Sequence, residues 1–159
     1  LILNGHTTNA PLIAQVTRAL RRERGAVVAS VDLWPSVPVA LLTEHFGEAP
    51  ARGHGGEPIT SVALHLLLGE ARALDVHPPD RRGRLLDLPL RGVSGADFDG
   101  LRVNLPVNAA EIAPDGLLGG DATRASAEAG AAITEDLVTR LSTLVAHLQN
   151  APAAGKDPS

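Results

Sequence analysis

The stretch LILNGHTTNAPLIAQVTRALRRERGAVVASVDLW, residues 1–34, decides the predicted fold. Residues 1–4 read as a buried strand, and apolar side chains then recur at helical spacing from Asn9, a favoured helix N-cap, to Gly25. Residues 26–34 form a second apolar run, which predicts a strand parallel to the first. A strand, a helix and a parallel strand make a βαβ unit, so we expect an α/β fold.

The middle of the chain alternates apolar segments with stretches rich in glycine and proline. Residues 35–59 read as a long functional loop that can hold a short helix at 37–47, and residues 60–68 predict a helix. A third strand is expected over 72–78, and short strands or ordered loops over 79–120.

The C-terminal part predicts a long amphipathic helix with Asp121 as its N-cap. The apolar stripe of this helix comprises Ala125, Ala129, Ile133, Leu137, Leu141, Leu144, Val145 and Leu148. We expect a single domain over residues 1–150 and a disordered tail, APAAGKDPS, over residues 151–159.

The composition excludes several classes of protein. A chain of 159 residues that is 44% hydrophobic can form one globular domain with its own core. A net charge of −4 without a Lys/Arg cluster argues against a nucleic-acid partner. The absence of cysteine excludes disulfides and thiolate chemistry, so any metal must be held by His, Asp or Glu. No apolar run reaches the ~20 residues that span a bilayer, and we expect a cytoplasmic protein with no membrane partner.

The chain contains no methionine, even at position 1. Because an initiator methionine is not normally removed before a large residue such as Leu1, we expect the N-terminal part of a longer protein to be missing. A processed domain is the alternative.

The first candidate site is the segment NGHTTN, residues 4–9. Ligands of open parallel sheets bind at the carboxyl ends of strands, and His6 lies just beyond such an end. Gly5 allows a tight turn, and the helix that follows offers free N–H donors at its start. The alternative is a loop histidine that is hydrogen-bonded to a carbonyl.

The second candidate site is the segment RGHGGEPITS, residues 52–61. His54 and Glu57 lie three positions apart in a glycine-rich loop before a helix, so both can face one cavity. In the alternative, Glu57 is a first-turn acid favoured by the helix dipole, His54 is exposed, and Thr60 or Ser61 caps the helix.

Three ordered blocks resemble the creatininase family of creatinine amidohydrolases and their relatives. The first family block reads NGHGGN or a close variant after a strand, and NGHTTN stands here at Asn4–Asn9. The second reads HAGE-x-ETS before an apolar helix, and HGGEPITS stands here at His54–Ser61. The third reads GVLGDP-x-x-A-x-x-E-x-G, and GLLGGDATRASAEAG stands here at Gly116–Gly130. The order and spacing of the blocks agree over nearly the whole chain.

The resemblance implies a three-layer α/β/α creatininase-like fold with a mainly parallel sheet, truncated at its N-terminus. Family members carry upstream a first strand and an E-x-H segment followed by Asp. The resemblance also implies hydrolysis of a non-peptide C–N amide bond, in a ring or a formamide, by a water that two divalent ions (Zn or Mn) activate. His6 matches the metal-binding histidine, and His54 matches the histidine that polarises the substrate or transfers protons. Relatives are commonly homohexamers, so a homo-oligomer is expected.

Two departures from the family pattern concern the metal site. Ile59 stands where the family has a metal-binding glutamate, and Thr8 stands where creatininase proper has another glutamate. Glu57 matches the last residue of HAGE and can serve as a substitute ligand, and Asp32 is a further carboxylate at the end of the second strand. We predict His6 and Glu57 as metal ligands, with weak or absent binding in the chain as given, since catalytic sites usually need three protein ligands.

The remaining ring residues give weaker signals. Trp34 can pack in the core, but family members use tryptophans near the pocket to stack a flat substrate, which assigns Trp34 to substrate binding. His45 lies in the long loop and is assigned to the rim of the same pocket. His65 is expected to be a packed or a capped surface histidine, and His77 and His147 to be ordinary surface histidines.

The resemblance thus implies the C-terminal portion of a metal-dependent amidohydrolase that acts on a small amide, inactive as this fragment alone. The alternative is a catalytically degenerate creatininase-like binding or accessory subunit, with Ile59 as the lesion. A third interpretation, a phosphate- or nucleotide-binding domain, rests on GHTTN at a helix start but lacks a P-loop lysine and a GxGxxG motif.

Overall fold

The computed structural model describes residues 1–47, 53–67, 83–91, 95–113, 116–117 and 122–152. The chain divides into two compact units, and each is described by itself. Unit 1 comprises residues 1–38 and 134–159, and unit 2 comprises residues 39–133. The single domain expected over residues 1–150 stays a prediction.

Unit 1 contains the predicted βαβ segment. Strand β1 (Ile2–Asn4) and strand β2 (Ser30–Asp32) are parallel, with helix α1 (Ala10–Arg24) between them in the sequence. A 3₁₀ turn, η1 (Thr7–Asn9), leads into α1. Strand β2 is shorter than the predicted run of residues 26–34, but its parallel pairing with β1 is confirmed.

The ends of α1 follow from its sequence. Pro11 lies in the first turn, where no N–H is needed. Asn9 occupies the N-cap position, although its side chain makes no capping hydrogen bond. Gly25 ends the helix in the left-handed region, with φ of 65°, and donates its N–H to the carbonyl groups of Arg21 and Leu20.

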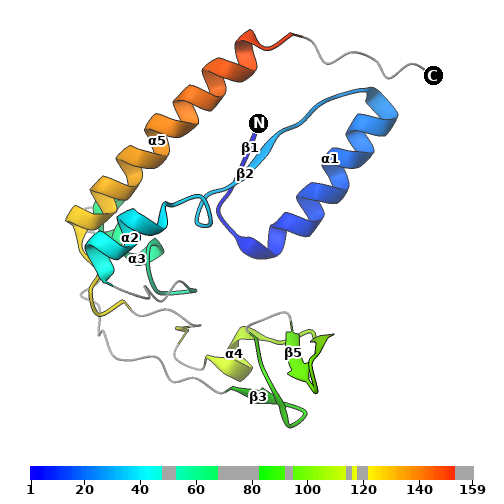
Figure 1. Ribbon diagram of the computed structural model, residues 1–159, viewed down its shortest axis with the longest axis vertical. Coiled ribbons are helices and arrows are strands. Elements are labelled where there is room, and N and C mark those ends of the chain that lie inside the picture. The colour runs from blue at the N-terminus through cyan, green and yellow to red at the C-terminus, as the bar shows by residue number, and fades with distance from the viewer. Residues whose placement is uncertain (48–52, 68–82, 92–94, 114–115, 118–121, 153–159) are drawn as a thin grey trace. The chain divides into compact units, whose positions relative to one another are not determined.

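The long helix α5 (Ala127–Asn150) confirms the predicted C-terminal helix, and its part from residue 134 onward belongs to unit 1. Figure 1 shows the β1–β2 pair between α1 and α5. Arg140 of α5 donates a hydrogen bond to the Ser36 carbonyl at 2.8 Å, beyond the end of β2. Val37 and Leu137 are the buried apolar side chains among the described residues of this unit.

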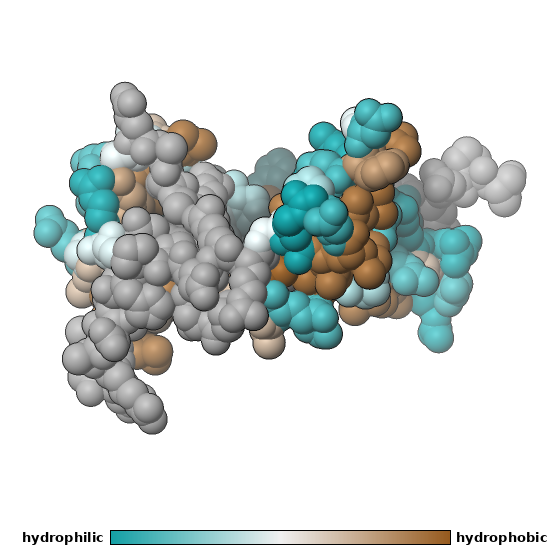
Figure 2. Space-filling model, turned by 90° about the horizontal axis from the view of Figure 1, so that it is seen from below, coloured by the Kyte–Doolittle hydropathy of each residue, from teal (hydrophilic) through white to brown (hydrophobic). Residues whose placement is uncertain are grey.

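Much of the apolar surface of unit 1 is exposed. Leu3 of β1 and Leu12 and Val16 of α1 each leave half or more of their surface open to solvent. Figure 2 shows hydrophobic residues gathered on one face, with hydrophilic residues around them. A two-stranded sheet is too small to cover the apolar faces that pack on it.

Unit 2 holds most of the buried apolar residues of the described chain. Helices α2 (Val39–Phe46) and α3 (Ile59–Leu66) confirm the helices expected near residues 37–47 and 60–68. The buried apolar residues of this unit are Leu42, Phe46, Val62, Ala96, Ile112, Ala113, Ala122, Ala129 and Ile133.

A run of short antiparallel strands occupies part of the region where short strands or ordered loops were predicted. The strands are β3 (Arg84–Leu85), β4 (Leu88–Pro89), β5 (Gly95–Phe98) and β6 (Leu101–Asn104). The short helix α4 (Ala109–Ile112) follows them in the sequence. β3 pairs with β4 and β5 with β6, and a bridge between Leu90 and Ala96 joins the two pairs.

The mixed α/β class is confirmed, but the sheets differ from the expected one. Within the described ranges, the strands form one parallel and two antiparallel pairs rather than a mainly parallel sheet. The strand expected over 72–78, the cap assigned to Asp121 and most of the tail over 151–159 lie outside the described residues. The α5 helix starts at Ala127, and Ser126 Oγ accepts the N–H of Ala129 at 3.1 Å, so Ser126 caps it. None of the described helices is long and apolar enough to cross a bilayer.

Candidate functional site

The carboxyl edge of the β1–β2 pair is the first part of the candidate site. Asn4 and Asp32 are the last residues of their strands and stand opposite each other in the parallel register. The Asn4 side chain is only 4% exposed, and its amide Nδ2 donates to Asp32 Oδ1 at 2.6 Å. The register therefore joins a buried amide to a carboxylate at the edge where ligands of parallel sheets bind.

His6 is held just beyond this edge. Its backbone N–H donates to Asn4 Oδ1 at 3.1 Å, and the residue is exposed. Its ring Nδ1 lies 2.8 Å from Thr8 Oγ1. Metal-binding histidines are oriented by a hydrogen bond at one ring nitrogen, so the contact with Thr8 suits the predicted role of His6.

Trp34 is also tied to the His6 loop. Its indole Nε1–H donates to the Gly5 carbonyl at 2.6 Å, and the side chain is half-buried. A buried or half-buried tryptophan usually places its N–H on a partner while the ring packs. Trp34 therefore holds the backbone before His6, and substrate stacking by its ring stays a prediction.

The second part of the candidate site is the loop before α3. Glu57 is 2% exposed, and its Oε2 accepts the backbone N–H of Ser61 at 3.3 Å. The carboxylate thus lies at the N-terminus of α3, where an anion is favoured by the exposed N–H groups and the helix dipole. Gly55 has φ of 73°, and a Cβ there would come within 2.5 Å of Leu117 Cδ2, so the loop needs a glycine at this position.

The predicted caps of α3 have other partners. Helix α3 begins at Ile59, and the Pro58 N-cap makes no side-chain capping bond. Thr60 Oγ1 donates to the Gly55 carbonyl at 2.8 Å, and the fully buried Ser61 Oγ accepts the N–H of Ser126 at 3.1 Å. Thr60 and Ser61 therefore do not cap α3; Thr60 closes the glycine-rich loop and Ser61 fixes the start of α5.

The remaining histidines of the described chain lie on separate elements. His54 is exposed in the glycine-rich loop. His45 is half-buried near the end of α2, and its ring centre lies 6.2 Å from that of Phe46. His65 is half-buried in α3. His147 of α5 is exposed, and His77 lies outside the described residues.

The structure brings some predicted site residues together and not others. Asp32, Trp34 and His6 share the edge of unit 1, and His54 and Glu57 share one loop of unit 2. Among the described residues, no group of three or more His, Cys, Asp or Glu side chains lies close enough to hold a metal ion. The described residues therefore do not by themselves make a complete metal site.

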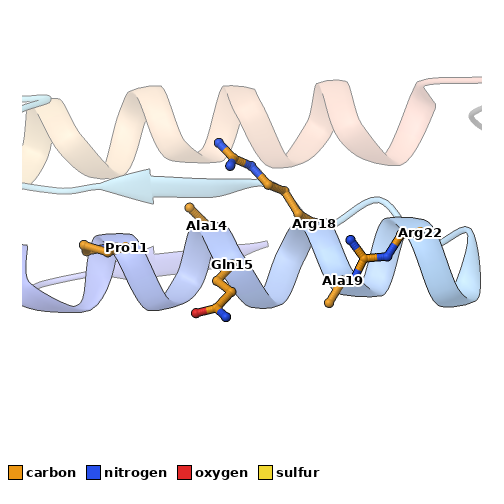
Figure 3. Close-up of a pocket in the computed structure, with 6 residues that line it drawn as sticks. All are labelled: Pro11, Ala14, Gln15, Arg18, Ala19 and Arg22. Carbon is orange, nitrogen blue, oxygen red and sulfur yellow. The ribbon is translucent and has the colours of Figure 1, made fainter.

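A cavity of about 500 Å³ lies elsewhere, on α1. Its lining residues are Pro11, Ala14, Gln15, Arg18, Ala19 and Arg22. Figure 3 shows that all six belong to α1, and none of them is a predicted site residue. This open groove on one helix is not the candidate site.

Two residues important to the site gave little signal in the sequence. Asn4 was part of the NGH block, but its bond to Asp32 depends on the register between residues 28 positions apart. Ser126 was one of several polar residues before the last helix, although serine is a favoured N-cap. The role of Asn4 follows from the strand pairing, and the role of Ser126 follows from the residue at which α5 begins.

Comparisons with known proteins agree with the site blocks. A sequence profile of the family Creatininase, described as creatinine amidohydrolase, matches residues 1–145. The crystal structure of creatinine amidohydrolase (creatininase) is similar to the chain, with a TM-score of 0.64 and 25% identity. The match covers 94% of this chain and 55% of the crystallised chain, so this chain spans little more than half of that protein. No curated protein sequence matches the chain. The profile covers most of the sequence, and the chain therefore belongs to the creatininase family.

Proposed function

We propose that the protein is a metal-dependent amidohydrolase that cleaves a non-peptide C–N amide bond, of the cyclic-amide or formamide type. The observation that carries the proposal is the family match over residues 1–145, which spans all three sequence blocks. The chain covers 55% of the similar creatininase, and the activity is proposed for the natural protein to which this sequence belongs.

The proposal assigns roles to residues of the two candidate loops. His6 and Glu57 are the metal ligands of this chain, and His54 is the acid–base histidine that exchanges protons with the substrate. Trp34 and His45 border the substrate. The hydrogen bond between His6 and Thr8 supports a ring held in one orientation. Among the described residues, no third His, Cys, Asp or Glu side chain completes a metal-binding group with these ligands.

We also propose a substrate class, an ion, a location and an oligomeric state for the enzyme. A small amide is the substrate, zinc or manganese is the ion, and the natural protein is a cytoplasmic homo-oligomer, hexameric by family resemblance. The expected three-layer fold with a mainly parallel sheet belongs to the same proposal. The likeness to the creatininase crystal structure supports this fold.

Hydrolysis assays on the natural full-length protein test the enzymatic proposal. Creatinine and a formamide are offered with added Zn²⁺ or Mn²⁺, and product formation is followed. His54→Ala is expected to lower kcat by about a hundredfold or more, the usual loss for an acid–base group. His147→Ala is the matched control because His147 is exposed on α5, and it is expected to leave kcat unchanged. Equal rates in wild type and His54→Ala would refute the role of His54.

One observation favours a second candidate, a degenerate family member that binds or assists a partner. Glu57 accepts a hydrogen bond from the first turn of α3, and Ile59 offers no ligand atom. A carboxylate engaged at a helix start serves the fold without any metal. Full-length protein that neither hydrolyses amides nor retains metal would support this candidate against the enzyme.

A further inference from the structure

A single buried side chain connects the two polar residues at the edge of the β1–β2 pair. Asn4 is 4% exposed, and its carboxamide uses both of its ends. The oxygen accepts the N–H of His6 at 3.1 Å, and the nitrogen donates to Asp32 at 2.6 Å. Buried polar groups are costly unless they are bonded, so these contacts hold the amide in one orientation.

The chemistry of the position requires an amide. A carboxamide is both a donor and an acceptor, whereas an ionised carboxylate only accepts. A carboxylate at position 4 would accept from His6 as Asn4 does, but it would face the negative charge of Asp32 at hydrogen-bond distance. An apolar residue would satisfy neither partner.

The loop has a second anchor, which holds the carbonyl of the same peptide whose N–H Asn4 accepts. Trp34, two residues beyond Asp32, donates its indole N–H to the Gly5 carbonyl at 2.6 Å. The Gly5–His6 peptide is thus held at its N–H by a side chain of β1 and at its carbonyl by a side chain that follows β2. Because both distant partners, Asp32 and Trp34, come from the end of β2 and the residues just after it, the position of His6 depends on the strand register.

We propose that Asn4 is a positioning residue, which places the His6 backbone and turns the Asp32 carboxylate toward the same edge. This inference rests on the proposed function in one respect, since the site that His6 serves is taken from that proposal. Asn4 touches neither substrate nor metal in this role. It makes His6 and Asp32 one coupled unit, so that a change at either end of the amide displaces the other.

Four variants test the coupling in the natural full-length protein. Asn4→Asp removes the donor and adds a charge, and Asp32→Asn removes the opposite charge. The double variant Asn4→Asp/Asp32→Asn restores one donor and one carboxylate with their strands exchanged. Asn9→Ala is the matched control, because Asn9 lies in the same loop and makes no side-chain capping bond.

Two readouts do not depend on metal. The first is a double-mutant cycle on urea unfolding, in which we expect Asn4→Asp to lower the midpoint and the exchanged pair to recover most of the loss. The second is the NMR signal of the His6 ring, the Trp34 indole N–H and the His6 amide. We expect all three to shift in Asn4→Asp and to return toward wild type in the double variant, with Asn9→Ala unchanged.

The third readout is metal retained by the purified protein. Loss of a group that orients a ligand typically lowers metal affinity about 10–100-fold, and we expect that range for Asn4→Asp. A wild type without metal would refute the proposed function, while the cycle and the NMR signals would still decide the role of Asn4. An exchanged pair no more stable than Asn4→Asp, or a His6 spectrum unmoved by Asn4→Asp, would overturn the positioning role.

Discussion

Gly130 shows how a single atom determines the packing around the second candidate loop. A Cβ at this position would lie 2.0 Å from the carbonyl oxygen of Ser61 and 2.9 Å from the Cβ of His65. Glycine in a helix costs about 1 kcal/mol relative to alanine, so propensity alone favours replacement. The backbone of α3 cannot move away easily, because Ser61 is fully buried and bonded to Ser126. Close packing therefore outweighs propensity here.

Gly130→Ala is expected to destabilise the protein by about 2 kcal/mol or more, the cost of forcing atoms into a filled core. Urea unfolding measures the change in free energy. Gly83→Ala is the control, because a Cβ at Gly83 meets nothing within 4 Å. A Gly130→Ala protein as stable as wild type would show that α3 and α5 do not approach as described.

The elements divide into those that the sequence predicts and those that it does not. Helices α1, α3 and α5 follow from periodicity and from local signals such as Gly25 in the left-handed region. Ser126 caps α5 through a hydrogen bond with Ala129, three residues along the chain, and serine is a locally favoured N-cap. The bond between Ser126 and Ser61 and the coupling of Asn4 to Asp32 join residues far apart in the sequence, so no local pattern predicts them. The candidate site is accordingly predicted as a set of residues, and its hydrogen bonds are not.

Two tight turns illustrate a local signal that was available. The β5–β6 turn consists of Asp99 and Gly100, both at positive φ, and Asp-Gly is a favoured pair for such hairpins. The β3–β4 turn places Leu86 and Asp87 at φ of 52° and 58°. Leucine is disfavoured in this left-handed conformation, and Leu86 is 77% exposed. The β3–β4 turn is therefore strained at Leu86, whereas the β5–β6 turn is not.

Leu86→Asn is expected to stabilise the protein by about 1 kcal/mol, because asparagine tolerates the left-handed conformation and no packing is lost. The thermal midpoint should rise by a few degrees in a scan of the purified protein. Gly100→Ala is expected to lower the thermal midpoint, since Gly100 has φ of 78°. A lower midpoint for Leu86→Asn would mean that the Leu86 side chain contributes packing.

Ser126→Ala is expected to cost about 1 kcal/mol through loss of the α5 N-cap. Thr143→Ala is the matched control, because Thr143 is exposed on the same helix and bonds only within it. Urea unfolding of both variants measures the change in the free energy of unfolding, which we expect to be larger for Ser126→Ala. Equal stability of the two variants would place the true start of α5 elsewhere.

At the scale of the whole molecule, family membership and function rest on different evidence. The profile match covers residues 1–145, whereas the similar creatininase crystal structure is matched over 55% of its length. Within the described part of the chain, the candidate ligands do not gather into a group of three. The central claim is therefore that the natural protein binds metal through the His6 block.

Metal content of the purified full-length protein, measured by mass spectrometry, tests that claim most directly. The samples are wild type, His6→Ala and the exposed-histidine control His147→Ala. We expect at least one divalent ion per chain in wild type and in His147→Ala, and a loss of metal in His6→Ala. Wild-type protein that holds no metal after supplementation would contradict metal binding through the His6 block. Equal amounts of metal in wild type and His6→Ala would contradict it as well.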